Sequence, residues 1–227
     1  EQRELLPTLH PDQVERLLSE PSAETRADTA TIVAGLLNNV DLSESERALA
    51  LDVITVLARD VSERVRQAVC ESMMRSPLLP PEIARQLADD VEKISVPLLM
   101  VTDVLCESDF IDLVHKGNIA KQLAIAQRAY VSERLSDALI ATENGDVVTA
   151  LLSNPAAEIA EHGYHRIIDT LQNDQRVQQA IVGRLFIPLT VTHRLIQVVS
   201  EELREEMVQR LRLPTELVES FLTQGQR

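Results

Sequence analysis

The chain of 227 residues is long enough for one large domain or two small ones, and its 44% share of hydrophobic residues suits a globular core. Only 2% of the residues are aromatic and six are glycine, which disfavours a β-sandwich or barrel with many tight turns and leaves Leu, Val, Ile and Ala to build the core. The net charge of −14 repels phosphate groups, so we expect neither nucleic acid nor an anionic membrane as a partner.

The cellular compartment is indicated by the cysteines and by the apolar runs. Cys70 and Cys106 both lie in apolar helical patterns, which is typical of buried free thiols in a reducing compartment. No apolar run approaches the ~20 residues of a membrane span, and no stretch resembles a signal peptide. The sequence opens with Glu1 and Gln2 instead of Met. We therefore expect a soluble cytoplasmic protein, and the start without Met leaves open whether the chain is a piece of a longer protein.

Apolar residues recur at helical spacing along the chain, with no sustained alternation of period two. Ser43 and Glu46 have the spacing of a capping box, and Pro81 suits the first position of a helix. Pro97 is expected to break or begin a helix, because proline lacks the backbone N–H donor. The predicted helices are 12–19, 22–38, 43–59, 62–75, 81–89, 97–105, 109–116, 118–127, 132–142, 146–153, 156–171, 174–183, 188–198, 200–210 and 214–223.

The first half contains a repeat. Leu57–Val61 (LARDV) recurs 30 residues later as Leu87–Val91 (LADDV), and each block ends one predicted helix and turns into the next. An arginine follows the turn carboxylate of the first block after six residues, and the same spacing occurs once earlier in the chain. A carboxylate in such a turn can cap free amides and can meet an arginine of its own or of a neighbouring repeat. The residues expected to stabilise the repeats are Asp60, Arg66, Glu20, Arg26 and Asp90.

The second half carries a different signature, in which an arginine is followed after three residues by Ser or Pro and then by an aliphatic residue. The copies are Arg128, Ser132 and Leu135; Arg184, Pro188 and Val191; and Arg210, Pro214 and Leu217, with Asn154 as a degenerate copy. A period of 26 to 30 residues accommodates two short helices and two turns. We predict an all-α solenoid of stacked helical pairs that runs through both halves, with repeats 1–112 and 113–227 on either side of the change in signature.

The segment Leu57–Arg66 resembles a HEAT-type repeat, which has an aspartate in the inter-helix turn and an arginine six residues later. The wider order is similar to a bacterial, mainly alphaproteobacterial, family of HEAT-like helical-repeat proteins catalogued only as a domain of unknown function. The resemblance runs from about 12 to 217 and rests on 21–26, 45–50, the two Leu-Ala blocks, 124–126 with Arg128, 131–132 and 137–139. It implies an α-solenoid with a regulatory or signalling role and supplies no catalytic residue. Val96 and Pro97 stand where the next arginine of the HEAT pattern would fall.

One group of residues has the spacing of metal ligands. His162 and His165 lie three residues apart, and Glu158 and Asp169 flank them on the same predicted helix face. Gly163 weakens a helix at this point, and Glu–His pairs at such spacing are common surface ion pairs. The sequence also lacks a nucleophile elbow, a phosphate loop and a dinucleotide fingerprint. We therefore expect no metal, no cofactor and no enzymatic activity.

Charge is unevenly distributed between the two halves. Residues 1–112 carry 22 acidic and 10 basic side chains, whereas residues 113–227 carry 14 and 12. The acidic half is either a solvated surface or a docking face for a basic partner, for which Glu44, Asp52 and Glu63 are candidates. Arg128, Arg184 and Arg210 either contact a partner or ligand, or pair with carboxylates and helix ends between repeats.

These observations favour a regulatory module that binds a protein or peptide partner through one face of the solenoid. A sensor that binds a metabolite or second messenger between helices is the first alternative, and a metal-dependent enzyme is the second. The sequence leaves a homo-oligomer open.

Overall fold

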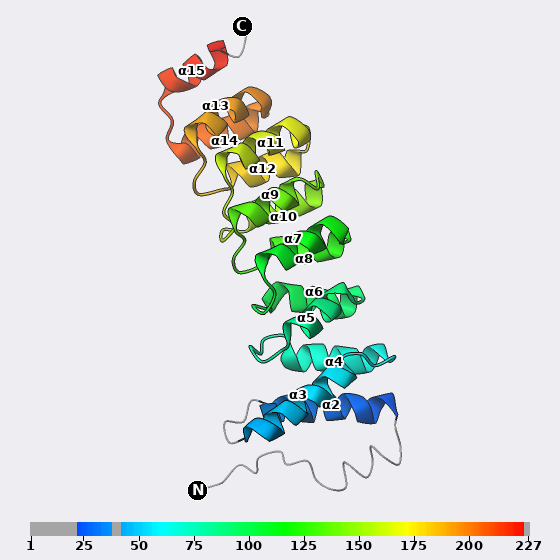
Figure 1. Ribbon diagram of the computed structural model, residues 1–227. Coiled ribbons are helices and arrows are strands. Elements are labelled where there is room, and N and C mark those ends of the chain that lie inside the picture. The colour runs from blue at the N-terminus through cyan, green and yellow to red at the C-terminus, as the bar shows by residue number, and fades with distance from the viewer. Residues whose placement is uncertain (1–21, 38–41, 225–227) are drawn as a thin grey trace, which may run out of the picture. The chain divides into compact units, whose positions relative to one another are not determined.

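The computed structural model describes residues 22–37 and 42–224. Within these ranges the chain forms fourteen α-helices and no β-strand, so the all-α prediction is confirmed. Figure 1 labels the helices along the chain. Their bounds are α2 Ala23–Leu37, α3 Glu44–Leu57, α4 Glu63–Met73, α5 Pro81–Asp89, α6 Glu92–Val101, α7 Glu107–Lys116, α8 Ile119–Ala126, α9 Glu133–Ile140, α10 Gly145–Ser153, α11 Glu161–Leu171, α12 Gln175–Val182, α13 Leu189–Val198, α14 Glu201–Leu211 and α15 Thr215–Gln224.

Several helix starts follow the expected capping chemistry. The Ser43 hydroxyl accepts a hydrogen bond from the Glu46 amide, and the Glu46 carboxylate accepts one from the Ser43 amide, which completes the capping box. The side chains of Ser132, Asn144 and Ser200 accept hydrogen bonds from amides in the first turns of α9, α10 and α14. The helix expected at 12–19 lies outside the described residues.

The prediction that Pro97 breaks or begins a helix is wrong, because Pro97 lies inside α6. Proline in a helix interior leaves one carbonyl of the preceding turn without its amide donor, here that of Lys93. The helix persists because its inner face is fully buried: Ile94, Leu98 and Leu99 have no exposed surface. Burial of three large aliphatic side chains, at roughly 1.5–3 kcal/mol each, exceeds the ~3 kcal/mol cost of an interior proline.

The chain divides into two compact units, Glu1–Asp109 and Phe110–Arg227. In the first unit, α2 packs against α3 and α4, α4 packs against α6, and α5 packs against α6. The largest buried side chains of this unit are aliphatic or sulfur-containing, as the low aromatic content requires, and include Leu37, Ile54, Met73, Ile83 and Leu87.

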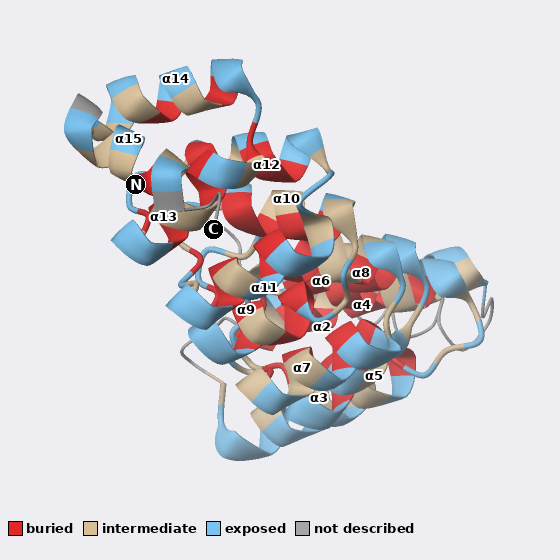
Figure 2. Ribbon diagram, turned by 90° about the horizontal axis from the view of Figure 1, so that it is seen from above, coloured by how far each residue is buried: buried red, intermediate tan, exposed pale blue. Residues whose placement is uncertain are grey.

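In the second unit the helices alternate between two layers (Figure 1). Helices α8, α10, α12 and α14 form one layer in which each contacts the next, and α9, α11, α13 and α15 form the other. Figure 2 shows the buried residues along the facing sides of these helices. The predicted stacking of helical pairs is therefore confirmed. The loops that join α8 to α9, α10 to α11 and α12 to α13 all lie on one side of this unit (Figure 1).

The two cysteines differ. Cys70 is buried in α4, where desolvation raises the pKa of its thiol to about 12. Cys106 is exposed, with its Sγ 3.0 Å from the Asp109 Oδ2, so the expectation of a buried thiol is wrong at this position. The reason is local: Cys106 immediately precedes α7, where its amide is capped by the Asp109 carboxylate.

Candidate functional site

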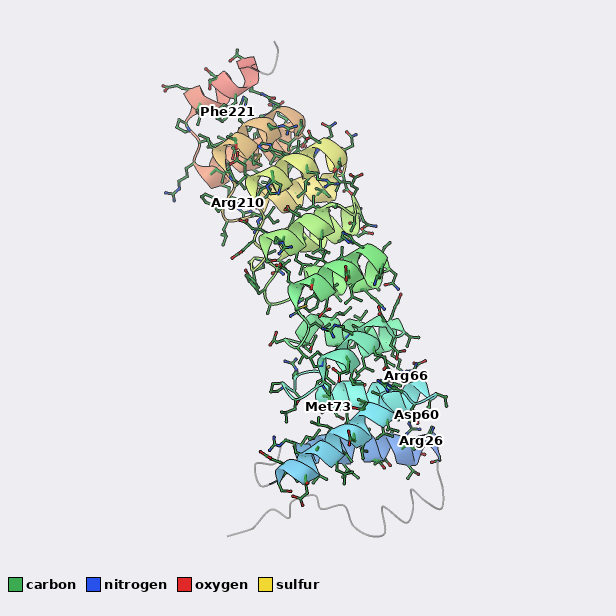
Figure 3. All side chains as sticks on the ribbon, viewed as in Figure 1. Arg26, Asp60, Arg66, Met73, Arg210 and Phe221 are labelled. Carbon is green, nitrogen blue, oxygen red and sulfur yellow. The ribbon has the colours of Figure 1, made fainter. Side chains whose placement is uncertain are left out.

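The aspartates of the first unit bind arginines of the preceding helical pair. Arg26 on α2 donates to both carboxylate oxygens of Asp60, at 2.6 and 2.8 Å. Arg66 on α4 donates to both oxygens of Asp90, also at 2.6 and 2.8 Å. Both pairs are bidentate, the geometry in which arginine binds a carboxylate most strongly. Figure 3 shows Arg26, Asp60 and Arg66 together along one side of this unit.

Asp60 and Arg66 also act within their own repeat. The Asp60 carboxylate accepts a hydrogen bond from the Ser62 amide at 2.8 Å, and the Arg66 guanidinium donates to the Asp60 carbonyl at 2.9 Å. The Asp60 carboxylate therefore pairs with an arginine of the neighbouring repeat, Arg26, and the Asp60 carbonyl pairs with the arginine of its own repeat, Arg66. The Arg26 guanidinium lowers the pKa of Asp60, although partial desolvation opposes this. Glu20, the remaining member of the predicted set, lies outside the described residues.

Arg184 connects two repeats of the second unit. Its guanidinium donates to the carbonyls of Leu152, Asn154 and Ala157, at 3.0, 3.2 and 2.7 Å. Leu152 is in the last turn of α10 and Asn154 is its C-cap, so a cation satisfies carbonyls at a helix C-terminus.

Arg210 and Asn154, at the same position of the signature, also donate to carbonyls of the preceding repeat, whereas Arg128 contacts an aromatic ring. Arg210 donates to the carbonyl of Gly183, the C-cap of α12, at 2.6 Å. The side-chain amide of Asn154 donates to the carbonyls of Ala126 and Arg128, at 2.9 and 2.8 Å. This degenerate copy therefore also donates to carbonyls of the preceding repeat, although its side chain is neutral. The Arg128 guanidinium lies 4.2 Å from the centre of the Phe110 ring, a cation–π contact. The signature thus places hydrogen-bond donors between successive repeats.

The acidic candidates lie on the surface of the first unit. Glu44 is in the first turn of α3, Asp52 is farther along that helix, and Glu63 begins α4; all three are exposed. The Glu63 carboxylate is 3.7 Å from the Lys93 ammonium. Within the described part of the chain, Glu44 and Asp52 have no ion-pair partner.

His162 and His165 point to different neighbours. The His162 Nε2 is 2.9 Å from the Asp137 carboxylate on α9, whereas the His165 Nδ1 is 3.2 Å from the Arg194 guanidinium on α13. Asp169 also pairs with Arg194. Across residues 22–37 and 42–224, no group of three or more His, Cys, Asp or Glu side chains is placed to hold a metal ion.

A feature that the sequence reasoning missed lies two residues after Arg128 and Arg184, two of the three arginines of the second signature. Tyr130 and Phe186 occupy this position in their repeats, and they are 59% and 79% exposed. Leu185, beside Phe186, is 91% exposed, whereas Val131 and Ile187, one position farther on, are buried. The sequence signal was available: the chain has only five aromatic residues, and two of them fall at one repeat position.

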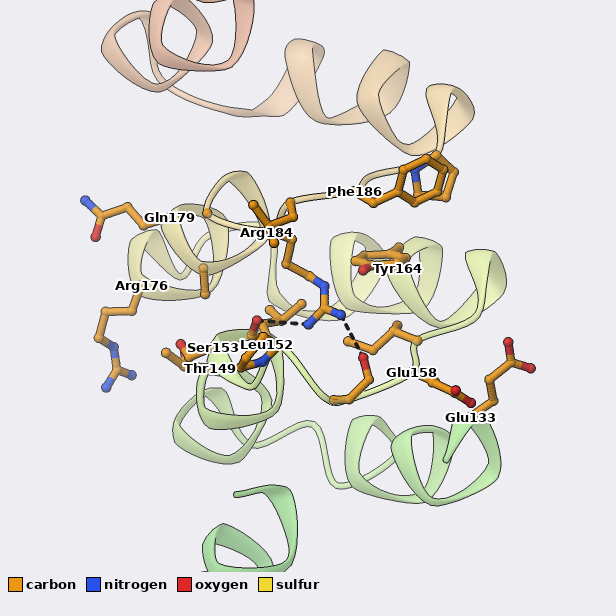
Figure 4. Close-up of a pocket in the computed structure, with 17 residues that line it drawn as sticks. Glu133, Thr149, Leu152, Ser153, Glu158, Tyr164, Arg176, Gln179, Arg184 and Phe186 are labelled. Carbon is orange, nitrogen blue, oxygen red and sulfur yellow. Dashed lines mark hydrogen bonds between the residues drawn. The ribbon is translucent and has the colours of Figure 1, made fainter. Parts of the chain in front are cut away.

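A cavity of about 860 Å³ lies beside these loops (Figure 4). Its apolar wall comes from Leu152, Ile159, Leu185 and Phe186, and its polar lining includes Glu133, Glu158, Arg176 and Gln179. Figure 4 shows Arg184 extending across the cavity, with two of its hydrogen bonds drawn as dashed lines. These residues come from the start of α9, from α10, α11 and α12, and from the loops that follow α10 and α12.

The polar groups in the cavity are not equally available. Arg184 is engaged by three carbonyls, and Arg176 pairs with Asp146 and Asp174. Tyr164 is almost fully buried; desolvation raises the pKa of its phenol, and the neighbouring Arg184 opposes the shift.

Three further side chains of the cavity have unused bonding capacity. The Thr149 Oγ1 is buried without a hydrogen-bond partner. Glu158 accepts a hydrogen bond from the Tyr130 hydroxyl at 3.2 Å. Neither Glu133 nor Glu158 forms a salt bridge with an arginine or lysine of the described residues, and both line the cavity.

Repeats of paired helices joined by exposed loops, with a cavity beside those loops, define a helical-repeat protein with a candidate binding groove. A family model described as an uncharacterised protein conserved in bacteria (DUF2336) matches residues 94–226, which is more than half of the chain. The chain therefore belongs to this family. Neither a curated protein nor a solved structure gave a significant match. Among the described residues, no helix is long and apolar enough to cross a membrane.

Proposed function

We propose that this protein is a non-catalytic interaction module that binds a protein or peptide partner through the loops of its second helical unit. The observation that carries the proposal is the exposure of Tyr130 and Phe186 at one repeat position. A large apolar side chain left in water forgoes roughly 1.5–3 kcal/mol of burial. In a chain with five aromatic residues, two that are exposed at the same repeat position, on the α8–α9 and α12–α13 loops, support a surface that is covered when a partner binds.

The remaining features of the cavity support binding over chemistry. Both arginines that line it are engaged by backbone carbonyls or by aspartates, so their charges hold the repeats in place. The same proposal includes a regulatory or signalling role and a cytoplasmic location. The free thiols of Cys70 and Cys106 support a reducing compartment.

The experiment is capture of partners from the native bacterial host with the immobilised chain, followed by mass spectrometry. The double variant Tyr130→Ala, Phe186→Ala removes the exposed aromatic rings. The matched control is Leu49→Ala, Val56→Ala, because these side chains on α3 are also exposed, at 65% and 70%. The proposal expects a partner that the wild type and the control retain and the aromatic variant loses. Equal capture by all three proteins would refute it.

A sensor of small ligands is a second candidate, because the volume of the cavity is in the range of small-molecule sites and the Thr149 Oγ1 inside it lacks a partner. A thermal-shift screen with metabolites and second messengers tests it. The sensor proposal expects a ligand that raises the melting temperature of the wild type and has less effect on the nearly isosteric Thr149→Val variant.

A further inference from the structure

The loops of the second unit pair with one another in one place and are separated in another. Val131 and Ala157 form an isolated parallel bridge, in which the Glu158 amide donates to the Val131 carbonyl at 2.9 Å. The next loop, 184–188, makes no such bridge with 155–158. The Arg184 side chain reaches the Ala157 carbonyl instead, and the cavity lies beside this contact. Backbone pairing between loops is thus a contact that this unit already uses.

The backbone of the separated loop has unused hydrogen-bonding groups. The amides of Leu185, Phe186 and Ile187 donate to no acceptor in the described residues, whereas the Glu158 amide of the preceding loop is bonded. An extended chain placed along this loop could accept from these amides in the way that Val131 accepts from Glu158.

The charges at the cavity indicate what such a chain would carry. Figure 4 shows Glu133 and Glu158 at one side of the cavity and Arg176 at the other. The two carboxylates lack a cationic partner within the described ranges, while the charge of Arg176 is offset by Asp146 and Asp174. The side of the rim at Glu133 and Glu158 therefore presents negative charge, while the guanidinium of Arg184, the other cation that lines the cavity, is directed at backbone carbonyls. Leu185 and Phe186 add an apolar surface to the same cavity, so a cation beside an apolar group complements this side.

We propose that this groove takes an extended peptide segment in which a lysine or arginine lies close to a large apolar side chain. The apolar side chain packs on Leu185 and Phe186, and the cation lies between Glu133 and Glu158. This inference rests on the proposed function and adds the chemistry of the partner and its place of docking.

The first step of the test is selection of random peptides, displayed on phage, against the intact chain. The inference expects enrichment of sequences that combine Lys or Arg with Leu, Ile, Phe, Tyr or Trp. Synthetic copies of the enriched peptides, labelled with a fluorophore, then give dissociation constants by fluorescence anisotropy. We expect Phe186→Ala to weaken binding about 30-fold, as loss of a central aromatic anchor does.

A charge-neutral variant tests the second anchor. Glu133→Gln with Glu158→Gln should weaken binding about tenfold and flatten its dependence on salt, because the attraction to the peptide cation is removed at nearly constant shape. The matched control, Glu205→Gln with Glu206→Gln, removes two exposed carboxylates on α14 that do not line the cavity, and it should bind as the wild type does. All four side chains are exposed, so circular dichroism should show unchanged folding.

The outcomes separate this inference from the proposed function. If enriched peptides bind the Phe186→Ala and double glutamine variants as tightly as the wild type, docking in this groove is refuted, while peptide binding by the module stands. Enrichment of acidic peptides, or of none, refutes the inference as well. The proposed function itself fails only if partner capture from the host is also insensitive to the aromatic variant.

Discussion

The Arg66 guanidinium donates two hydrogen bonds to the Asp90 carboxylate, at 2.6 and 2.8 Å, although the two residues are 24 positions apart. A third hydrogen bond runs from Arg66 to the Asp60 carbonyl at 2.9 Å. One side chain thus connects two successive inter-helix turns. Since the pair is largely shielded from water, with the two side chains 18% and 10% exposed, these contacts are worth more than an ordinary surface ion pair.

We predict that Asp60 and Arg66 stabilise the repeats and do not contact a partner. Asp60→Ala removes the acceptor of the Arg26 and Ser62 hydrogen bonds and should lower the free energy of unfolding by about 2 kcal/mol. Urea denaturation measures this change. Asp52→Ala, at an exposed position on α3, is the control and should have little effect. If Asp60→Ala left stability unchanged and abolished partner capture, Asp60 would be a binding residue.

The same carboxylate predicts how stability responds to acid. The Arg26 guanidinium holds the pKa of Asp60 below its ordinary value in the folded chain. The unfolded chain therefore takes up a proton first as pH falls, so the stabilisation is complete above about pH 4 and is lost as pH falls through the folded pKa. The Asp60→Asn variant should lose less stability than the wild type over this acid range. Urea titrations between pH 7 and pH 3 measure the difference; parallel curves for the two proteins would contradict the assignment.

The fold was predictable from the sequence because helix periodicity and capping are local properties. Ser43 with Glu46 marked a helix start that the structure contains. The prediction that Pro97 breaks or begins a helix was wrong because the inner face of α6 is buried by tertiary contacts, which local sequence patterns do not describe. The late start of α11, at Glu161 instead of residue 156, has the same cause: the backbone around Ala157 pairs with Val131 in another loop.

The candidate site was less predictable. The spacing of Arg184 and Arg210 is visible in the sequence, but their acceptors, which are carbonyls of the preceding repeat, are not. Every residue has a backbone carbonyl, so the residue type does not indicate which carbonyl accepts a hydrogen bond. The exposure of Phe186 likewise depends on its loop, because Ile187 beside it is buried and similarly apolar.

A third prediction concerns metal. His162 pairs with Asp137, whereas His165 lies against Arg194, so the two imidazoles do not converge on one point. We expect the chain purified from metal-replete medium to carry no stoichiometric zinc or iron, because an arginine beside His165 repels a cation. Inductively coupled plasma mass spectrometry measures the content. One metal ion per chain that disappears in His162→Ala would overturn this expectation.

The last prediction separates the two roles that the acidic first half could have. If Glu44, Asp52 and Glu63 steer a basic partner, association should slow as salt rises, because charges farther apart than the Debye length, ~10 Å at 0.1 M, are screened. Dissociation should change less. The triple variant Glu44→Gln, Asp52→Asn, Glu63→Gln should therefore slow association at low salt, as measured by stopped-flow fluorescence with the captured partner.

The control for this experiment is Glu201→Gln, Glu202→Gln, Glu205→Gln on α14. The Arg204 guanidinium lies 3.7 Å from the Glu201 carboxylate, so the local field there is already smaller than around Glu44 and Asp52. The double variant Glu44→Gln, Asp52→Asn is measured beside the triple variant, because replacement of Glu63 leaves the positive charge of Lys93 without the carboxylate 3.7 Å away, and that charge also repels a basic partner. Equal slowing by both triple variants, or slowing by neither, would mean that the first half only solubilises the chain. Binding would then depend on the loops around Tyr130 and Phe186.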